Sequence, residues 1–497
     1  MSPISRREVL KLSAFGSIGA LSGTGCSWVA GAGASPSVPR PGQPLINTRM
    51  FWTWDHSTEW SLNLPGAHTI GSCSEYDRTT AAFIQDYTAL FSWCRSHNIN
   101  AVIVWGLLRV THGGLDSAKQ LCDVAAEYGV RLLCGVGLNA YGGVYYEGNS
   151  PYNLETHLQA NPQLYAVDAN DNSINCSTDW DGNRYPLTNT TVPGPRGFYM
   201  ACPSRVENQE FIADSLVWLF KNLPLGGVQM ETGDTGVCQC TLCRNRRQYP
   251  VSSFSWEDMA LLYPLAAKAI RSVASDAWIV CETYSHPQPY DAGPGLAPDF
   301  GYGKPPWADA ALAAFPPGVF VQWVGDRYVR EDNPALVWTA EGRPPRGDLL
   351  HQMRVHFGTD WGWGAFRGED AVDWIAKLVK MSMAAAIQGI TMFGEVSPLL
   401  TGAELNYLAL TDFGSTSNPT ASRQLFEERI AAPLLGGADN AYDFAQFAGL
   451  LDRLYPDRLN LIPAALPQMY GRLTTLTPEA ARRWCWLASE MASYTPL

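Results

Sequence analysis

Residues 225–247 read LGGVQMETGDTGVCQCTLCRNRR, and they carry the clearest indication of the architecture. The apolar run from Gly227 to Met230 predicts a buried strand, and Glu231 and Asp234 follow where that strand should end. The end of a buried parallel strand is the usual position of a catalytic acid in a barrel. We therefore expect a parallel barrel that presents Glu231 at its mouth.

Seven further short runs have the same apolar character. They lie at 49–55, 100–106, 130–138, 278–284, 319–323, 335–341 and 389–395. Most are followed by amphipathic segments such as 79–97, where Phe83, Tyr87 and Leu90 recur at helical spacing. Eight strands alternating with helices predict an α/β fold of the (β/α)8 TIM-barrel type. Only about a dozen residues separate the sixth run from the seventh, which is near the lower limit for a crossover helix.

The barrel is expected over 47–398, with a long polar insertion at 140–205 and a helical C-terminal region at 399–497. An insertion of this length inside a compact domain is usually a functional loop or a small subdomain. In the C-terminal region the periodicity predicts helices at 403–410, 422–435, 441–454 and 478–492.

The first 34 residues have the features of an export signal. Residues 5–11, SRREVLK, are similar to a twin-arginine signal, and the apolar stretch 12–25 that follows is too short to span a bilayer. Residues 32–34, AGA, fit a peptidase site that would leave 35–46 as a linker; alternatively, Cys26 is the lipidated residue of a lipoprotein. We expect a periplasmic or extracellular protein that contacts the membrane only through such an anchor.

The composition excludes some partners. Only 16% of the residues are charged and the net charge is −12, which argues against binding to nucleic acid or to an anionic membrane surface. The 18 tryptophans and 21 tyrosines either pack the core or supply flat surfaces for the faces of sugars. Composition alone leaves both interpretations open.

In a closed parallel barrel the residues after the strand ends gather at one rim. Those residues are Asp55, His56, Trp105, Asn139, Glu231, Asp234, Glu282, Trp323, Glu341 and Glu395. Carboxylates among tryptophans suit glycoside cleavage, in which one acid protonates the leaving oxygen and a second stabilises or attacks the oxocarbenium-like centre. We expect Glu231 to be the acid/base and Glu395 or Glu341 to be the second carboxylate. The other seven residues are expected to bind substrate.

Three cysteines follow Glu231 in the spacing C-x-C-x-x-C: Cys238, Cys240 and Cys243. Together with a fourth thiolate, for which Cys202 is the best candidate, they could hold a tetrahedral zinc ion. Four thiolates leave no open position, so this zinc would be structural. A disulfide within the cluster is the alternative. The likeness to a twin-arginine signal implies export of an already folded protein, which favours the metal.

Residues 202–204, a helix, and then Glu231 with the three cysteines resemble the zinc-containing β-galactosidases of glycoside hydrolase family forty-two. This resemblance covers residues 202–243 and implies a barrel with its acid/base on the fourth strand and a structural zinc on the four cysteines. Met230 stands where that family has asparagine. Residues 389–398, GITMFGEVSP, and 404–414, ELNYLALTDFG, resemble uncharacterised barrel glycosidases related to hexosaminidases and α-glucuronidases.

Two functions from different classes fit the sequence. The first is an exported glycoside hydrolase that acts on a carbohydrate without a catalytic cofactor. The second is a non-catalytic carbohydrate-binding surface protein on a degenerate barrel. A metal-dependent hydrolase is less favoured, because the 8 histidines form no H-x-H or H-E-x-x-H motif.

Overall fold

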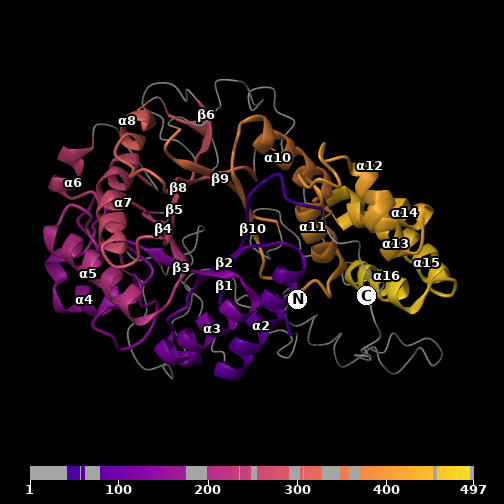
Figure 1. Ribbon diagram of the computed structural model, residues 1–497, viewed down its shortest axis with the longest axis horizontal. Coiled ribbons are helices and arrows are strands. Elements are labelled where there is room, and N and C mark those ends of the chain that lie inside the picture. Colours follow the sequence, from indigo (N-terminus) through magenta and orange to yellow (C-terminus); the bar gives the residue numbers. More distant parts are fainter. Residues whose placement is uncertain are drawn as a thin grey trace, which may run out of the picture.

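The computed structural model describes residues 42–55, 58–61, 79–174, 199–233, 236–247, 254–289, 303–305, 307–326, 329, 347–357, 370–451 and 456–492. Eight parallel strands close into a barrel in the order β1-β10-β9-β8-β5-β4-β3-β2 (Figure 1). They are β1 (Thr48–Trp54), β2 (Ala101–Trp105), β3 (Arg131–Gly137), β4 (Gly227–Glu231), β5 (Trp278–Glu282), β8 (Phe320–Val324), β9 (Leu350–Val355) and β10 (Gly389–Phe393). The predicted (β/α)8 barrel is confirmed.

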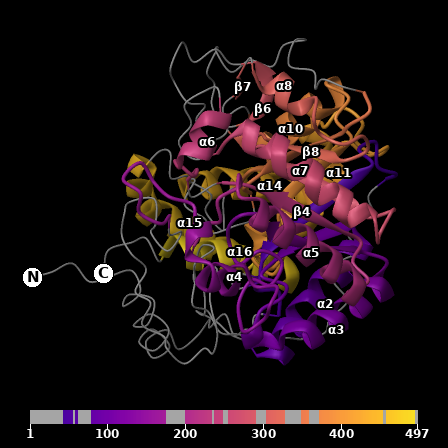
Figure 2. The same cartoon turned by 90° about the vertical axis from the view of Figure 1, so that its left-hand side faces the viewer.

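Helices cover the outside of the barrel (Figures 1 and 2). The larger ones are α2 (Thr80–Ser96), α3 (Gly114–Tyr128), α5 (Val206–Asn222), α7 (Trp256–Arg271), α10 (Val372–Ala384) and α11 (Thr401–Asp412). Shorter turns are η1 (Val110–His112), α4 (Leu154–Ala160), η2 (Pro162–Leu164), α6 (Thr241–Arg246) and α8 (Ala308–Leu312). A separate two-stranded sheet pairs β6 (His286–Pro289) with β7 (Gly303–Lys304).

The predicted seventh strand was wrong. Its residues, 335–341, lie outside the described part of the chain, and the seventh place in the barrel, between β8 and β10, belongs to β9. The sequence of β9, LHQMRV, looks too polar for a buried strand. Its polarity is satisfied inside the barrel, since Gln352 joins a hydrogen-bonded layer and Arg354 pairs with Glu282.

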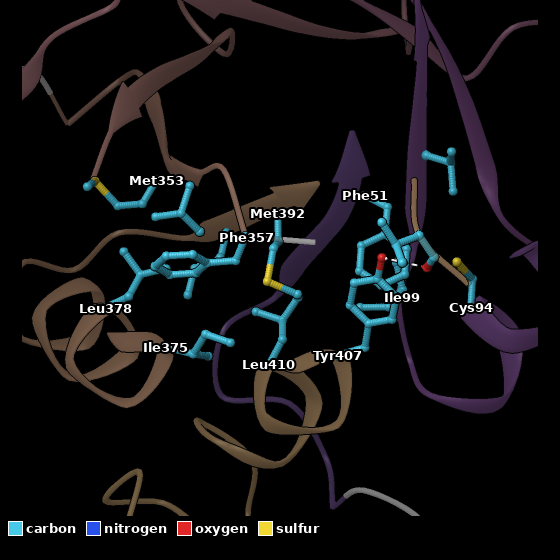
Figure 3. Close-up of a cluster of buried hydrophobic side chains, with 14 of the residues drawn as sticks. Phe51, Cys94, Ile99, Met353, Phe357, Ile375, Leu378, Met392, Tyr407 and Leu410 are labelled. Carbon is cyan, nitrogen blue, oxygen red and sulfur yellow. Dashed lines mark hydrogen bonds between the residues drawn. The ribbon is translucent and has the colours of Figure 1, made fainter. Parts of the chain in front are cut away.

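The outer faces of the strands pack against the helices. Figure 3 shows Phe51 of β1 and Met392 of β10 next to Tyr407 and Leu410 of α11, and the rings of Phe51 and Tyr407 lie 4.7 Å apart. Full burial of one such side chain contributes about 1.5–3 kcal/mol. This shell of apolar contacts fixes the barrel wall from outside.

The inside of the barrel holds a layer of uncharged hydrogen bonds. The indole N–H of Trp105 donates to Gln229 Oε1 at 2.8 Å. The Gln229 amide donates to Gln322 Oε1 at 3.4 Å, and the Gln322 amide donates to Gln352 Oε1 at 3.4 Å and to Thr391 Oγ1 at 3.3 Å. We call these five residues the amide layer. It joins β2, β4, β8, β9 and β10 across the interior.

The described part of 399–497 is largely helical, as predicted. After α11 come α12 (Arg423–Phe426), the π-helical turn η5 (Glu427–Ala431), α13 (Ala432–Leu435), α14 (Ala438–Ala448), η6 (Gly449–Leu451), η7 (Pro456–Leu461), α15 (Ile462–Leu473) and α16 (Pro478–Ala492). The helix α15 was not predicted. Buried Arg483 of α16 binds Glu404 of α11 at 2.7 Å, which ties this region to the barrel. Among the described helices none is long and apolar enough to span a membrane.

Candidate active site

Glu231 ends β4 and lies beside the end of β5. Met230 and Cys281 are paired across these strands, so the next residues, Glu231 and Glu282, are neighbours. Met230 belongs to the outer core and Gln229 to the interior amide layer. Since side chains alternate along a strand, Glu231 faces the interior. Both carboxylates are buried, and neighbouring carboxylates near a barrel mouth are groups suited to acid–base chemistry.

A tyrosine holds the carboxylate of Glu231. The hydroxyl of Tyr284 donates to Glu231 Oε2 at 2.6 Å. The backbone of Tyr284 is left-handed, with φ of 57°, which costs about 1–3 kcal/mol in a non-glycine residue. The carboxylate of Glu282 stabilises this turn, because its Oε1 accepts the N–H groups of Thr283 at 3.1 Å and Tyr284 at 2.8 Å. The strained turn therefore aims the phenol at Glu231.

The second carboxylate oxygen of Glu282 lies next to a cation. Arg354 Nε lies 3.0 Å from Glu282 Oε2, and its guanidinium lies 4.6 Å from the centre of the Trp52 ring. Tyr263 of α7 donates to the Glu282 backbone carbonyl at 2.6 Å. Burial raises the pKa of Tyr263, and the nearby Cys281, Glu282 and Glu231 raise that pKa further. Tyr263 therefore stays protonated.

A buried histidine–aspartate pair stands at the ends of β8 and β9. Asp326 Oδ1 accepts the backbone N–H of His356 at 2.8 Å, and Asp326 Oδ2 lies 2.8 Å from His356 Nδ1. The His356 ring stacks on Phe393 at 4.8 Å. Neither this pair nor Arg354 was predicted from the sequence. The signal for Asp326 was its place just after the sixth strand, whereas His356 and Arg354 were hidden by the misplaced seventh strand.

Glu395 follows β10, which stands four places from β4 around the ring of eight strands. Glu231 and Glu395 therefore come from opposite sides of the barrel. Glu395 is buried, and its Oε1 accepts the backbone N–H of Trp54 at 2.9 Å. The barrel brings these two predicted carboxylates to the same end, as a parallel arrangement requires.

The tryptophans predicted at the mouth divide between the interior and the exterior face of the barrel. Trp54 lies 4.9 Å from Trp105 and meets the edge of Tyr141 at 6.1 Å. Trp105 is fully buried in the amide layer, so it supports from below the aromatic wall, by which we mean the rings of Trp54, Tyr141 and Tyr146. Trp323 does not line the mouth as predicted: it belongs to the outer core and donates to His351 Nδ1 at 3.1 Å. Side chains alternate along β8, so Trp323 points outward beside Gln322, which points inward.

Asp55, predicted to bind substrate, belongs to a buried charge cluster. Arg109 Nε lies 2.8 Å from Asp55 Oδ2, and Arg109 Nη1 lies 2.6 Å from Glu147 Oε2. His112 Nε2 lies 3.3 Å from the same Asp55 oxygen. Burial by itself would lower the pKa of Arg109, but the carboxylates of Asp55 and Glu147 outweigh it and raise the pKa. The cluster holds the loops after β1, β2 and β3 together.

Replacing Arg109 with methionine should lower the free energy of unfolding by about 3–5 kcal/mol, because two buried carboxylates lose their cation. Chemical denaturation of Arg109→Met checks this value. The triple variant Arg109→Met, Asp55→Asn, Glu147→Gln removes all three charges and should recover part of the loss. A single variant as stable as the wild type would show that the cluster contributes no stability.

Of the remaining predicted site residues, only Asn139 lies within the described part of the chain. Asn139 follows β3 and is buried; its backbone carbonyl accepts the N–H of Ala201 at 2.8 Å. Within the described residues its side-chain Oδ1 has no hydrogen-bond partner. His56, Asp234 and Glu341 lie outside the described residues, so their roles stay predictions.

The four predicted cysteines come together beside the barrel mouth. The sulfurs of Cys202, Cys238, Cys240 and Cys243 all lie within 4.8 Å of one another, and none of the four is in a disulfide. Cys202 Sγ lies 3.6 Å from Cys240 Sγ and 3.5 Å from Cys243 Sγ. Sulfurs around a tetrahedral zinc with bonds of about 2.3 Å are about 3.8 Å apart. The donor set and its spacing therefore fit one zinc ion.

Arg247 attaches the segment that carries Cys238, Cys240 and Cys243 to α7. Arg247 donates to the carbonyl of Cys238 at 2.6 Å and binds Asp258 of α7 at 2.5 Å. Hydrogen bonds from the Cys202 and Cys238 thiols lower the pKa of Cys243. The loop that follows Glu231 is thus attached to α7 as well as to the cysteine cluster.

No protein-family model matches this sequence, and no curated protein sequence is detectably similar to it. Solved structures with a similar fold include a noncanonic maltogenic alpha-amylase from Thermotoga neapolitana, at 11% identity over 76% of this chain and 79% of that chain, with a TM-score of 0.42. A glycoside hydrolase family 20 beta-N-acetylglucosaminidase matches at 14% identity over 80% and 76%, with a TM-score of 0.43. An N-acetyl-beta-hexosaminidase from Streptomyces plicatus matches at 12% identity over 82% and 69%, also with a TM-score of 0.43. Likeness at this level carries no information about the reaction.

Proposed function

We propose that this protein is an exported glycoside hydrolase in which Glu231 is the general acid/base. The observation that carries the proposal is the setting of Glu231. It faces the interior at the end of β4, is bound by Tyr284 at 2.6 Å, and neighbours Glu282. Such a carboxylate can exchange a proton with a glycosidic oxygen.

Glu395 is our candidate for the second carboxylate. It comes from the strand opposite Glu231, so a sugar bound in the mouth would lie between the two acids, as glycoside cleavage requires. Glu282 is less suited, since Arg354 and two backbone N–H groups already engage its oxygens. Glu341 stays an alternative from the sequence alone.

The aromatic wall supports a carbohydrate as the substrate. Trp54 packs against both Tyr141 and Tyr146 above the amide layer. Flat rings beside hydrogen-bonding groups match the apolar faces and hydroxyl edges of a sugar. The non-catalytic alternative would use the same wall without turnover.

We further propose a structural zinc on Cys202, Cys238, Cys240 and Cys243. When bound, the ion would cross-link the segment before α5 to the loop after Glu231. All four positions are thiolates, so no ligand position is open for chemistry. Export by the twin-arginine route, after metal loading in the cytosol, is part of this proposal.

A substrate screen tests the proposed function. The purified protein is incubated with aryl glycosides and with plant and bacterial polysaccharides, and released aryl alcohol or reducing ends are measured. We expect turnover on at least one glycoside. Binding of a sugar in calorimetry without any release across the panel would favour the carbohydrate-binding alternative.

A further inference from the structure

We propose that Tyr284 is a positioning residue that fixes the carboxylate of Glu231 and favours its ionised form. This inference rests on the proposed function of Glu231 and assigns a role to a residue next to it. The hydroxyl of Tyr284 donates to Glu231 Oε2 at 2.6 Å, and both side chains are buried. A hydrogen bond donated to a carboxylate stabilises the charged form over the neutral acid.

The turn that carries Tyr284 is built to aim its hydroxyl. A left-handed φ of 57° is rare for a bulky residue, and here it is held by the carboxylate of Glu282, which accepts the N–H groups of Thr283 and Tyr284. The ring of Tyr284 also stacks on Phe254 at 5.2 Å. Backbone strain that the surrounding contacts maintain is typical of functional sites.

A chain of contacts connects this turn to β9, which is separated from β5 by β8 alone. Arg354 of β9 binds Glu282, and Glu282 holds the turn that places Tyr284 on Glu231. The titratable groups near Glu231 include Glu282 and Tyr284 after β5, Tyr263 of α7 and, through Glu282, Arg354. Tyr263 donates to a backbone carbonyl and not to the carboxylate.

Two substitutions should therefore move the ionisation of Glu231 in opposite directions. Tyr284→Phe removes the donor, which favours the neutral acid. Glu282→Gln keeps an oxygen for the two N–H groups but removes a neighbouring negative charge, which favours ionised Glu231. The matched control is Tyr87→Phe, which removes a buried hydroxyl that bonds Thr53 on the outer face of β1.

The experiment measures the pH dependence of kcat and kcat/KM for the wild type and the three variants. In Tyr284→Phe we expect the limb controlled by Glu231 to move up by about one pH unit. We also expect kcat at the optimum to fall about tenfold, because the carboxylate loses its fixed orientation, while KM is little changed. In Glu282→Gln the same limb should move down, and in Tyr87→Phe it should stay in place.

An infrared titration supplies a readout that needs no turnover. The carboxyl band of Glu231 is isolated as the difference between wild type and Glu231→Gln, and its midpoint is compared with the same difference made in the Tyr284→Phe and Glu282→Gln backgrounds. Opposite shifts in the two backgrounds support the proposal, and if Glu282→Gln folds poorly, an upward shift in the Tyr284→Phe background alone still supports it. Unmoved midpoints, or shifts in the same direction, overturn it. If Glu231→Gln keeps full turnover, the proposed function fails separately from this inference.

Discussion

Glu231→Gln should lower kcat by about 10³-fold while leaving sugar binding within a factor of about two. Glutamine keeps the size of the side chain and can still receive the Tyr284 hydroxyl, but it can neither give nor take the proton that glycoside cleavage requires. The measurement is steady-state turnover of the best glycoside from the screen, with binding of the same ligand followed by calorimetry. Loss of turnover together with retained binding is the expected result.

Glu155→Gln is the matched control for this experiment. Glu155 is also buried, in the first turn of α4, where it accepts hydrogen bonds from the Tyr199 backbone and Gln159. Burial raises its pKa to about 7, so an uncharged amide already resembles its state near neutral pH. We expect turnover of this variant to equal that of the wild type. Equal turnover in Glu231→Gln would end the assignment of Glu231.

Cys202→Ser should abolish zinc binding and lower the unfolding midpoint by about 10 °C. Serine is a poor ligand for this soft site, and without the ion the segment before α5 and the loop after Glu231 are no longer cross-linked. Zinc per chain is measured by elemental analysis of protein purified without added metal. We expect about one zinc per wild-type chain and about none in the variant.

A buried cysteine outside the cluster separates metal loss from simple loss of packing. Cys94 of α2 is fully buried and burial raises its thiol pKa, so it behaves as a small apolar side chain. Cys94→Ala should lower stability yet keep the full zinc content. A wild-type protein purified without zinc, and unaffected by a chelator, would contradict the structural zinc.

Strand patterns predicted the barrel well because burial on both faces leaves a plain signal. Seven strands were placed within one or two residues, and β9 was missed since its inward side chains are Gln352 and Arg354. Those residues are polar because they bond to partners on other strands, and no local pattern reveals such partners. The same limit hid Asp326 and His356, which pair across 30 residues of sequence.

Candidate site residues were predictable by position but not by contact. Strand ends located Glu231, Glu282 and Glu395 at one rim, and the cysteine spacing located a cluster that the fold assembles. No sequence pattern indicated that Asp55 would be paired with Arg109. Side chains alternate along a strand, so an inward-pointing Gln322 implies that Trp323 points outward.

The amide layer bears on how far apart the acids stand. Its bonds run from Gln229 of β4 through Gln322 to Thr391 of β10; Glu231 ends the first of these strands and Glu395 follows the second. In glycosidases a difference of only about 1–4 Å between the two acids separates retention of anomeric configuration from inversion. The uncharged amide layer would then set the separation of the two acids, and with it the stereochemical course, without contacting the sugar. Replacing Gln322 with alanine would loosen that separation without altering either acid.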